Sequence, residues 1–182
     1  SSQSRGLGDV YKRQNLECMS HCKSMEPDII SFGKKTQCCG IFAGKRLDEI
    51  DDHVFKESSR INSTFGGNLV DMVRFTIYLE IMESENLVDL VSENGSYLLS
   101  SLATLQNEES NVVSNVRGKG LFCAFDLPSS ELRNNLIAKV EEEGALILGC
   151  GHRSIRFRPH LNISKNEIDR AMVMIKSAMS KI

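Results

Sequence analysis

The segment Pro27-Asp28-Ile29-Ile30-Ser31-Phe32-Gly33-Lys34 carries a short apolar run up to a lysine. The β-rich residues 29–32, followed by a glycine and two lysines, predict a buried strand that opens into a loop. A lysine at the end of such a strand is partly desolvated, and the neighbouring Lys35 adds like charge, so both effects disfavour the charged form of Lys34. A lysine tuned in this way can form a Schiff base with an aldehyde cofactor. The residues alone leave a simpler alternative open, which is an ordinary solvated lysine pair at a strand end.

Periodic segments that follow this strand predict a mixed α/β chain. Apolar or alternating runs predict further strands at residues 38–44, 121–127, 145–148 and 154–158. Apolar residues at helical spacing predict helices at 46–54, 69–81, 87–105 and 128–144, and a final helix after the capping box Ser164-Lys165-Asn166-Glu167. Residues 107–114 are polar and predict a linker, and the elements that follow predict an α+β lobe.

A second candidate site is Ser63-Thr64-Phe65-Gly66-Gly67-Asn68, directly before the predicted helix at 69–81. Hydroxyl groups and glycine amides at a helix N-terminus suit a phosphate, because unpaired N–H groups point toward it. Simple capping by Ser63 or Thr64 explains the same residues without a ligand, and both interpretations stay open.

A third candidate is Arg156-Phe157-Arg158-Pro159. Strand alternation places Arg156 and Arg158 on one face and Phe157 on the other. An arginine on a rigid strand can bind a carboxylate through two parallel hydrogen bonds. The alternative is a solvated arginine pair on the face of a sheet.

Charge and composition limit the classes of partner. The 182 residues carry 22 basic and 24 acidic side chains, a net charge of −2, which argues against a nucleic-acid or anionic-lipid surface. No apolar run reaches the roughly 18 residues of a membrane helix, and the N-terminus lacks an apolar signal-peptide core, so we expect a cytoplasmic protein. Residues 1–14 are polar and aperiodic, and they predict a disordered or non-native tail.

The six cysteines predict free buried thiols in a reducing compartment, because they are too few for a disulfide scaffold. Cys18, His21 and Cys22 could supply three zinc ligands, but a fourth ligand is missing. We therefore predict no metal site.

Together these segments resemble the class III aminotransferases, which use pyridoxal 5'-phosphate. Residues 27–34 resemble the family's cofactor-lysine motif, and residues 156–159 are similar to its carboxylate-binding strand. Residues 31–40 and 59–68 resemble more narrowly the lysine ε-aminotransferase branch. The order and spacing of these blocks match from about residue 16 to the C-terminus.

The resemblance implies a role for each matching residue. Lys34 would form the Schiff base with the cofactor and shuttle the proton. Thr64 would bind the cofactor phosphate across a homodimer interface, with Asn62 and Ser63 beside it. Arg156 would hold the α-carboxylate of lysine or of 2-oxoglutarate.

The resemblance also implies a fold and a reaction. Residues 15–84 would form the end of the large α/β cofactor-binding domain with a linking helix, and residues 85–182 the small C-terminal α+β domain. The reaction would move the ε-amino group of L-lysine to 2-oxoglutarate. Two alternatives stay open, namely a related amino donor (ornithine, acetylornithine or 4-aminobutyrate) and a catalytically inert fragment or dimerisation partner.

The chain departs from the family pattern in two places. More than half of the enzyme, on the N-terminal side, has no counterpart, and that part would hold the acidic partner of the pyridine nitrogen. His160 stands where a proline usually follows Pro159.

Overall fold

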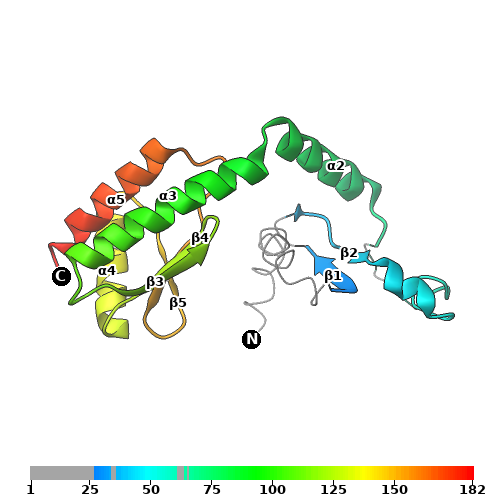
Figure 1. The fold of residues 1–182 in the computed structure, drawn as a ribbon, viewed down its shortest axis with the longest axis horizontal. Helices are drawn as coiled ribbons and strands as arrows, with labels where there is room; N and C mark the ends of the chain where they lie inside the picture. Colours follow the sequence, from blue (N-terminus) through cyan, green and yellow to red (C-terminus); the bar gives the residue numbers. More distant parts are fainter. Residues whose placement is uncertain (1–26, 34–35, 61–63, 65) are drawn as a thin grey trace. The chain divides into compact units, whose positions relative to one another are not determined.

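The computed structural model describes residues 27–33, 36–60, 64 and 66–182. The chain divides between Glu85 and Asn86 into two compact units, which are described one at a time (Figure 1). Residues 1–14 and the cluster of Cys18, His21 and Cys22 lie outside the described residues. Within the described part, no helix is long and apolar enough to span a bilayer, and no group of three or more side chains could hold a metal ion.

An antiparallel hairpin is the first element in the described part of the first unit. It pairs β1 (Ile29–Phe32) with β2 (Gly40–Ala43), so that Phe32 lies opposite Gly40. A Cβ at Gly40 would overlap the ring of Phe32, so a larger residue at this position would force the ring to shift. The Phe32 ring stacks on Phe42 at 4.6 Å and on Phe75 at 5.1 Å between centroids. The predicted strand at 29–32 is confirmed, but it is not buried: its residues alternate between exposed and half-buried, and Ile29 is 47% exposed. The strand predicted at 38–44 is confirmed in shorter form.

The helix predicted at 46–54 is wrong. The structure has only a 3-10 helix, η3 (Lys45–Glu49), in which no residue is buried. Gly44 provides no side-chain cap, and Ile50 already has an extended backbone. Short helices without a cap or a buried face are marginal in water, which explains why the periodic pattern does not continue as a helix.

Helix α2 (Leu69–Ser84) follows, as predicted, and Phe75 links it to the hairpin. Its N-cap is Asn68, whose Oδ1 accepts a hydrogen bond from the N–H of Val70 at 3.1 Å. Of the two interpretations of residues 63–68, the one in which Ser63 or Thr64 caps this helix is therefore wrong. The glycine pair at 66–67, with Gly67 at φ +76°, turns the chain so that the cap falls on the residue next to the helix.

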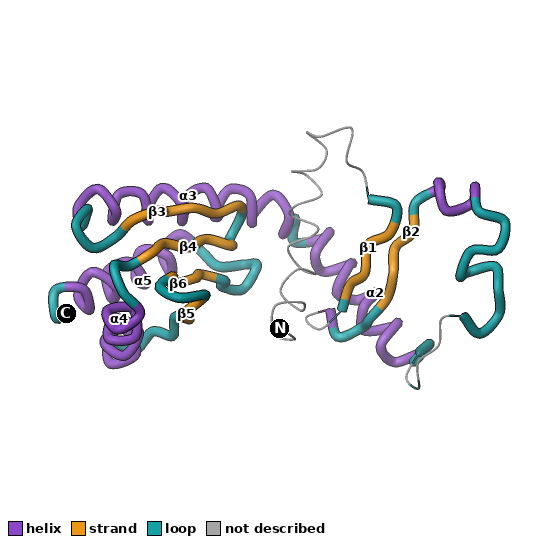
Figure 2. Tube along the Cα trace, turned by 90° about the horizontal axis from the view of Figure 1, so that it is seen from below, coloured by secondary structure: helices purple, strands orange, loops and turns teal. Residues whose placement is uncertain are grey.

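The second unit is built on a four-stranded antiparallel sheet with strand order β3-β4-β6-β5. The strands are β3 (Ser114–Lys119), β4 (Phe122–Asp126), β5 (Leu148–Cys150) and β6 (Ser154–Phe157). Three helices complete the unit: α3 (Leu87–Glu108), α4 (Ser130–Glu142) and α5 (Lys165–Met179). Figure 2 shows α3 running along β3, and the mixed α/β fold is confirmed.

One face of this sheet carries the core. Cys123 and Phe125 of β4 and Ile155 of β6 are almost fully buried against residues of all three helices. Because side chains alternate along a strand, Ala124 and Arg156 lie on the opposite face. The core thus fixes which side of the sheet presents the candidate arginine.

Two contacts tie α3 to the rest of the second unit. Gly95 lies so close to the β3–β4 turn that a Cβ would overlap the main chain of Gly120. The buried side chain of Asn94 donates a hydrogen bond to the carbonyl of Ile163 at 2.6 Å. The segment before α5 is further ordered by the predicted capping box, which is confirmed at Ser164 and Glu167.

Two sequence predictions fail in this unit. The linker predicted at 107–114 is shorter than expected at both ends, because α3 continues to Glu108 and β3 already begins at Ser114. β3 is a mostly exposed edge strand with an irregularity before Arg117, so it lacks the apolar alternation of a half-buried strand. The strand predicted at 145–148 begins three residues later than expected. Leu146 is 85% exposed, and only residues 148–150, which form β5, pair with β6.

Candidate active site

The predicted site residues fall in both units. Lys34, Asn62 and Ser63 lie outside the described residues. Thr64 is an exposed residue of the first unit, and Arg156 lies in β6 of the second unit. Gly33, immediately before Lys34, is buried, and a Cβ there would lie 2.7 Å from the Sγ of Cys39. The chain is therefore closely packed where it reaches the predicted Schiff-base lysine.

Arg156 occupies the middle of the second sheet. It lies opposite Ala124 of β4 on one side and opposite Leu148 of β5 on the other. Its Nε is buried and has no hydrogen-bond partner among the described residues. A buried donor without an acceptor is costly, so this side chain is suited to an anion that brings its own oxygen atoms. A carboxylate or a phosphate can pair with a guanidinium through two parallel hydrogen bonds.

Neighbouring residues hold Arg156 in place through the strand backbone. Ile155 is fully buried, and Phe157 packs against the core with its ring 5.8 Å from that of Phe125. These two residues fix the pleat of β6, which directs Arg156 to the other face, as the alternation predicts. β6 ends at Phe157, so Arg158 lies just beyond the strand.

A polar cluster that the sequence did not reveal lies on the same face. The carboxylate of Asp126 accepts hydrogen bonds from Ser154 (2.6 Å), Asn115 (2.8 Å) and Arg117 (2.9 Å). Burial by itself would raise the pKa of Asp126, but these hydrogen bonds and the charge of Arg117 outweigh it and lower the pKa to about 2. Asp126 therefore stays ionised at neutral pH, although only 7% of the residue is exposed.

The prediction of buried thiols holds for only part of the cysteines. Cys123 is buried, and burial raises its pKa to about 11, which makes it an unreactive thiol. Cys39 and Cys150 are exposed, contrary to the prediction. Cys150 lies on the edge strand β5, where no further strand covers it.

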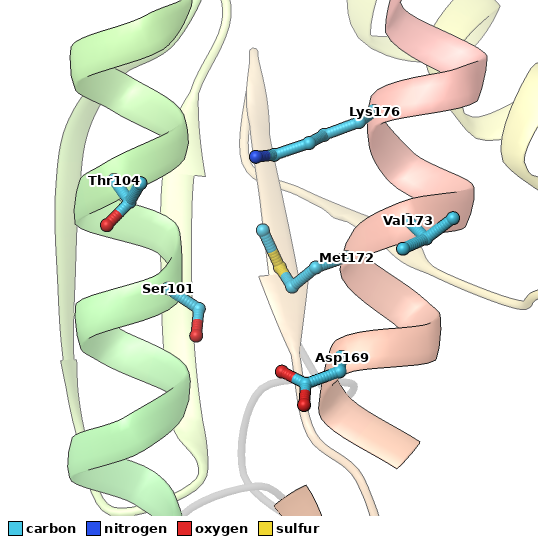
Figure 3. A pocket seen from close by; sticks show the side chains of 6 residues that line it. All are labelled: Ser101, Thr104, Asp169, Met172, Val173 and Lys176. Carbon is cyan, nitrogen blue, oxygen red and sulfur yellow. The ribbon is translucent and has the colours of Figure 1, made fainter. Parts of the chain in front are cut away.

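A shallow pocket of about 280 Å³ lies elsewhere, between α3 and α5 (Figure 3). Its lining residues are Ser101, Thr104, Asp169, Met172, Val173 and Lys176. Asp169 already accepts a hydrogen bond from the hydroxyl of Tyr97, and Lys176 pairs with Glu108. Because its charged groups are engaged and it holds none of the predicted site residues, the pocket is a weak candidate for a ligand site.

Comparisons with known proteins place this chain among enzymes. The family model described as "Aminotransferase class-III" matches residues 15–179. An L-lysine-epsilon aminotransferase of Streptomyces clavuligerus is 45% identical over 159 residues, which are 87% of this chain and 35% of that protein. A mitochondrial 4-aminobutyrate aminotransferase of Rattus norvegicus is 36% identical over 136 residues, which are 74% of this chain and 26% of that protein.

Comparison with solved structures also finds aminotransferases. The lysine aminotransferase of Mycobacterium tuberculosis, solved in the internal aldimine form, superposes with a TM-score of 0.84 at 43% identity. The match covers 89% of this chain and 37% of that one, so the chain spans about a third of the length of its relatives. Since the family model covers nearly the whole sequence, the chain belongs to the class III aminotransferases, a family that uses pyridoxal phosphate.

Proposed function

We propose that this chain is the C-terminal portion of a lysine 6-aminotransferase, which moves the ε-amino group of L-lysine to 2-oxoglutarate. The observation that carries the proposal is Arg156, a half-buried guanidinium whose Nε has no partner among the described residues, on the sheet face opposite the core. Both substrates carry an α-carboxylate, so one arginine can anchor the amino donor in the first half-reaction and the keto acid in the second.

The proposed domain assignment follows the two structural units. Residues 15–84 would be the end of the large cofactor-binding domain with a linking helix, and residues 85–182 the small α+β domain. The division of the chain between Glu85 and Asn86 supports this boundary.

The residue types in the first unit fit pyridoxal phosphate by their chemistry. When bound, this cofactor supplies an aldehyde that takes up amino groups and a ring that withdraws electrons from the reacting carbon. Lys34 offers a primary amine that would hold the aldehyde carbon and move a proton at the substrate carbon. Thr64 offers an exposed hydroxyl that would donate a hydrogen bond to the phosphate, with Asn62 and Ser63 as its neighbours.

The proposal includes a homodimer in which Thr64 serves the partner subunit's cofactor. Apolar side chains exposed on α2 support an interface on this helix, since large exposed apolar surfaces are typical of contact sites. They are Leu69, Val70, Met72, Val73, Ile77 and Ile81. The free cysteines among the described residues fit a reducing compartment such as the cytoplasm.

An alternative amino donor is supported by the 36% identity to a 4-aminobutyrate aminotransferase, which is lower than the 45% identity to a lysine aminotransferase. A donor panel separates these functions. Purified protein with pyridoxal phosphate and 2-oxoglutarate is incubated with lysine, ornithine, acetylornithine or 4-aminobutyrate, and glutamate is measured. We expect lysine to give the highest kcat/KM. A higher value for another donor contradicts the lysine assignment, and no glutamate from any donor supports the alternative of an inert fragment.

A further inference from the structure

We propose that Arg117 is a positioning residue for substrate binding: it occupies the carboxylate of Asp126 and thereby leaves the guanidinium of Arg156 available to the substrate carboxylate. The inference rests on the proposed function, because that function assigns the substrate carboxylate to Arg156. Arg117 lies on β3, a different strand from that of Arg156, and would act on the substrate only through its neighbours.

The sheet register brings the three side chains together. Arg117, Ala124 and Arg156 form one row across β3, β4 and β6, on the face opposite the core. Asp126 lies in the next row of that face, directly opposite Ser154. Asp126 and Arg156 are therefore diagonal neighbours on adjacent strands, a placement of about 7–8 Å that long side chains can bridge.

Asp126 is the natural competitor for Arg156. It is the only acidic residue in the four strands of this sheet, and it is nearly buried. A carboxylate in such surroundings attracts a guanidinium more strongly than an exposed one does, because water screens the pair less. Left without a cationic partner, Asp126 would draw in the nearest free guanidinium.

Other donors prevent this by filling both oxygen atoms of Asp126. Arg117 Nη1 and Ser154 Oγ donate to Oδ1, at 2.9 and 2.6 Å, and Asn115 Nδ2 donates to Oδ2 at 2.8 Å. Arg117 Nη2 also donates to Ser154 Oγ at 3.2 Å, which closes the cluster. Arg117 is the one charged donor among the three, so it supplies the cation that balances Asp126.

The buried Nε of Arg156, in contrast, has no partner among the described residues. Its cross-strand neighbour Ala124 carries only a methyl group and offers no acceptor. Arg117 is thus paired with the carboxylate of Asp126, whereas Arg156 remains available to the carboxylate of a substrate. The arrangement explains why two arginines share a row with a single acidic residue nearby.

The test compares three variants of the purified protein loaded with pyridoxal phosphate. Arg117→Met removes the charge and keeps the aliphatic stem, Arg117→Lys keeps the charge, and the double variant Arg117→Met/Asp126→Asn removes the charges of both partners. The Kd of 2-oxoglutarate is measured by isothermal titration calorimetry, and KM and kcat by steady-state kinetics.

We expect Arg117→Met to raise both Kd and KM roughly tenfold, as for loss of one charge-assisted hydrogen bond, with little change in kcat. Arg117→Lys stays near the parent, and the double variant recovers most of the lost affinity, because no carboxylate then competes for Arg156. An unchanged Kd in Arg117→Met overturns the inference. So does a double variant that binds as weakly as the single one, since Arg117 would then act only by holding β3.

Two controls keep the outcomes distinct. Urea unfolding of each variant shows whether it is folded. If Arg117→Met does not fold, Arg117→Gln replaces it, because glutamine keeps an N–H donor without the charge. The same rise in Kd and KM is expected for Arg117→Gln, and an unchanged Kd again overturns the inference. A folded parent protein that binds no 2-oxoglutarate contradicts the proposed function itself. Binding by the parent with no effect of Arg117 contradicts only the role of Arg117.

Discussion

At the scale of single residues, Arg156 is the side chain on which substrate binding depends in the proposed function. Its Nε is buried without an acceptor among the described residues, while its strand is anchored by the fully buried Ile155. Replacing Arg156 therefore removes an anion-binding group and leaves the core of the second unit intact.

We expect Arg156→Met to raise the KM for 2-oxoglutarate by roughly 100-fold, since a bidentate pair with a carboxylate is lost. The KM of Arg156→Lys should lie between that of the parent and that of Arg156→Met, because lysine keeps the charge without the planar pair of donors. Steady-state kinetics provide the measurement. Arg153→Met, at an exposed arginine in the turn before β6, is the matched control and should keep the parent KM. Equal effects at the two positions would contradict the assignment.

The lowered pKa of Asp126 predicts how the free energy of unfolding depends on pH. Its pKa is lowered to about 2 in the folded protein, against an unperturbed value of about 3.9. A carboxyl group with a lowered folded pKa stabilises the fold above its unfolded pKa, and this stability is lost as the pH falls through the folded pKa. The contribution at pH 6 is about 2 kcal/mol.

The difference in free energy of unfolding between the parent and Asp126→Asn should therefore shrink as the pH falls from about 4 to about 2. Urea unfolding at a series of pH values measures it. A difference that stays constant over this range would mean that Asp126 is not held ionised by Ser154, Asn115 and Arg117.

The limit of sequence reasoning at this scale is visible in Asp126. Strand alternation was enough to place Arg156 on the face opposite the core, and the structure agrees. The cluster around Asp126 could not be predicted, because its members come from three strands and one of those strands, β3, has no apolar pattern. The roles of Lys34, Thr64, Asn62, Ser63 and Arg156 stay predictions.

At the scale of elements, the four long helices and the strands β1, β2, β4 and β6 were predictable, whereas the edge strands β3 and β5 were not. The segments α2, α3, α4 and α5 all carry apolar residues at helical spacing, and each forms a helix close to its predicted bounds. β3 and β5 lie at the two edges of the sheet, where one side of the strand has no neighbour and polar residues are tolerated. Their limits depend on pairing with β4 and β6, which a local pattern does not encode.

The packing of α3 on the β3–β4 turn gives a test of stability. Alanine has a higher helix propensity than glycine, but at Gly95 its Cβ would overlap the main chain of Gly120. We expect Gly95→Ala to lower the free energy of unfolding by about 2 kcal/mol, as for an overpacked core. Urea unfolding measures the change. Ser96→Ala, at the exposed neighbouring position, should be nearly neutral, and a neutral Gly95→Ala would show that this contact is looser than the structure has it.

The capping box of α5 gives a second test. The Ser164 hydroxyl accepts from the N–H of Glu167, and the Glu167 carboxylate accepts from the N–H of Ser164. We expect Ser164→Ala to cost about 1 kcal/mol of unfolding free energy, because an N–H at the helix start loses its partner. Thermal unfolding measures the loss against Ser180→Ala, which changes an exposed serine at the other end of the helix. Equal effects of the two substitutions would argue against the cap.

At the scale of the whole molecule, the chain joins two units with different tasks in the proposed enzyme. The first holds the residues assigned to the cofactor, Lys34 and Thr64, and the second holds Arg156, assigned to the substrate carboxylate. The chain spans about a third of the length of its lysine aminotransferase relatives. The central question is therefore whether Lys34 is set apart from the other lysines as a Schiff-base residue.

Cofactor trapping answers this question most directly. The purified protein is incubated with pyridoxal phosphate and reduced with borohydride, and the modified lysine is mapped by mass spectrometry, in the parent and in the matched variants Lys34→Arg and Lys35→Arg. The proposal predicts a label confined to Lys34, which is kept in Lys35→Arg and lost in Lys34→Arg. A label scattered over the lysines, or one unchanged in Lys34→Arg, would contradict the account.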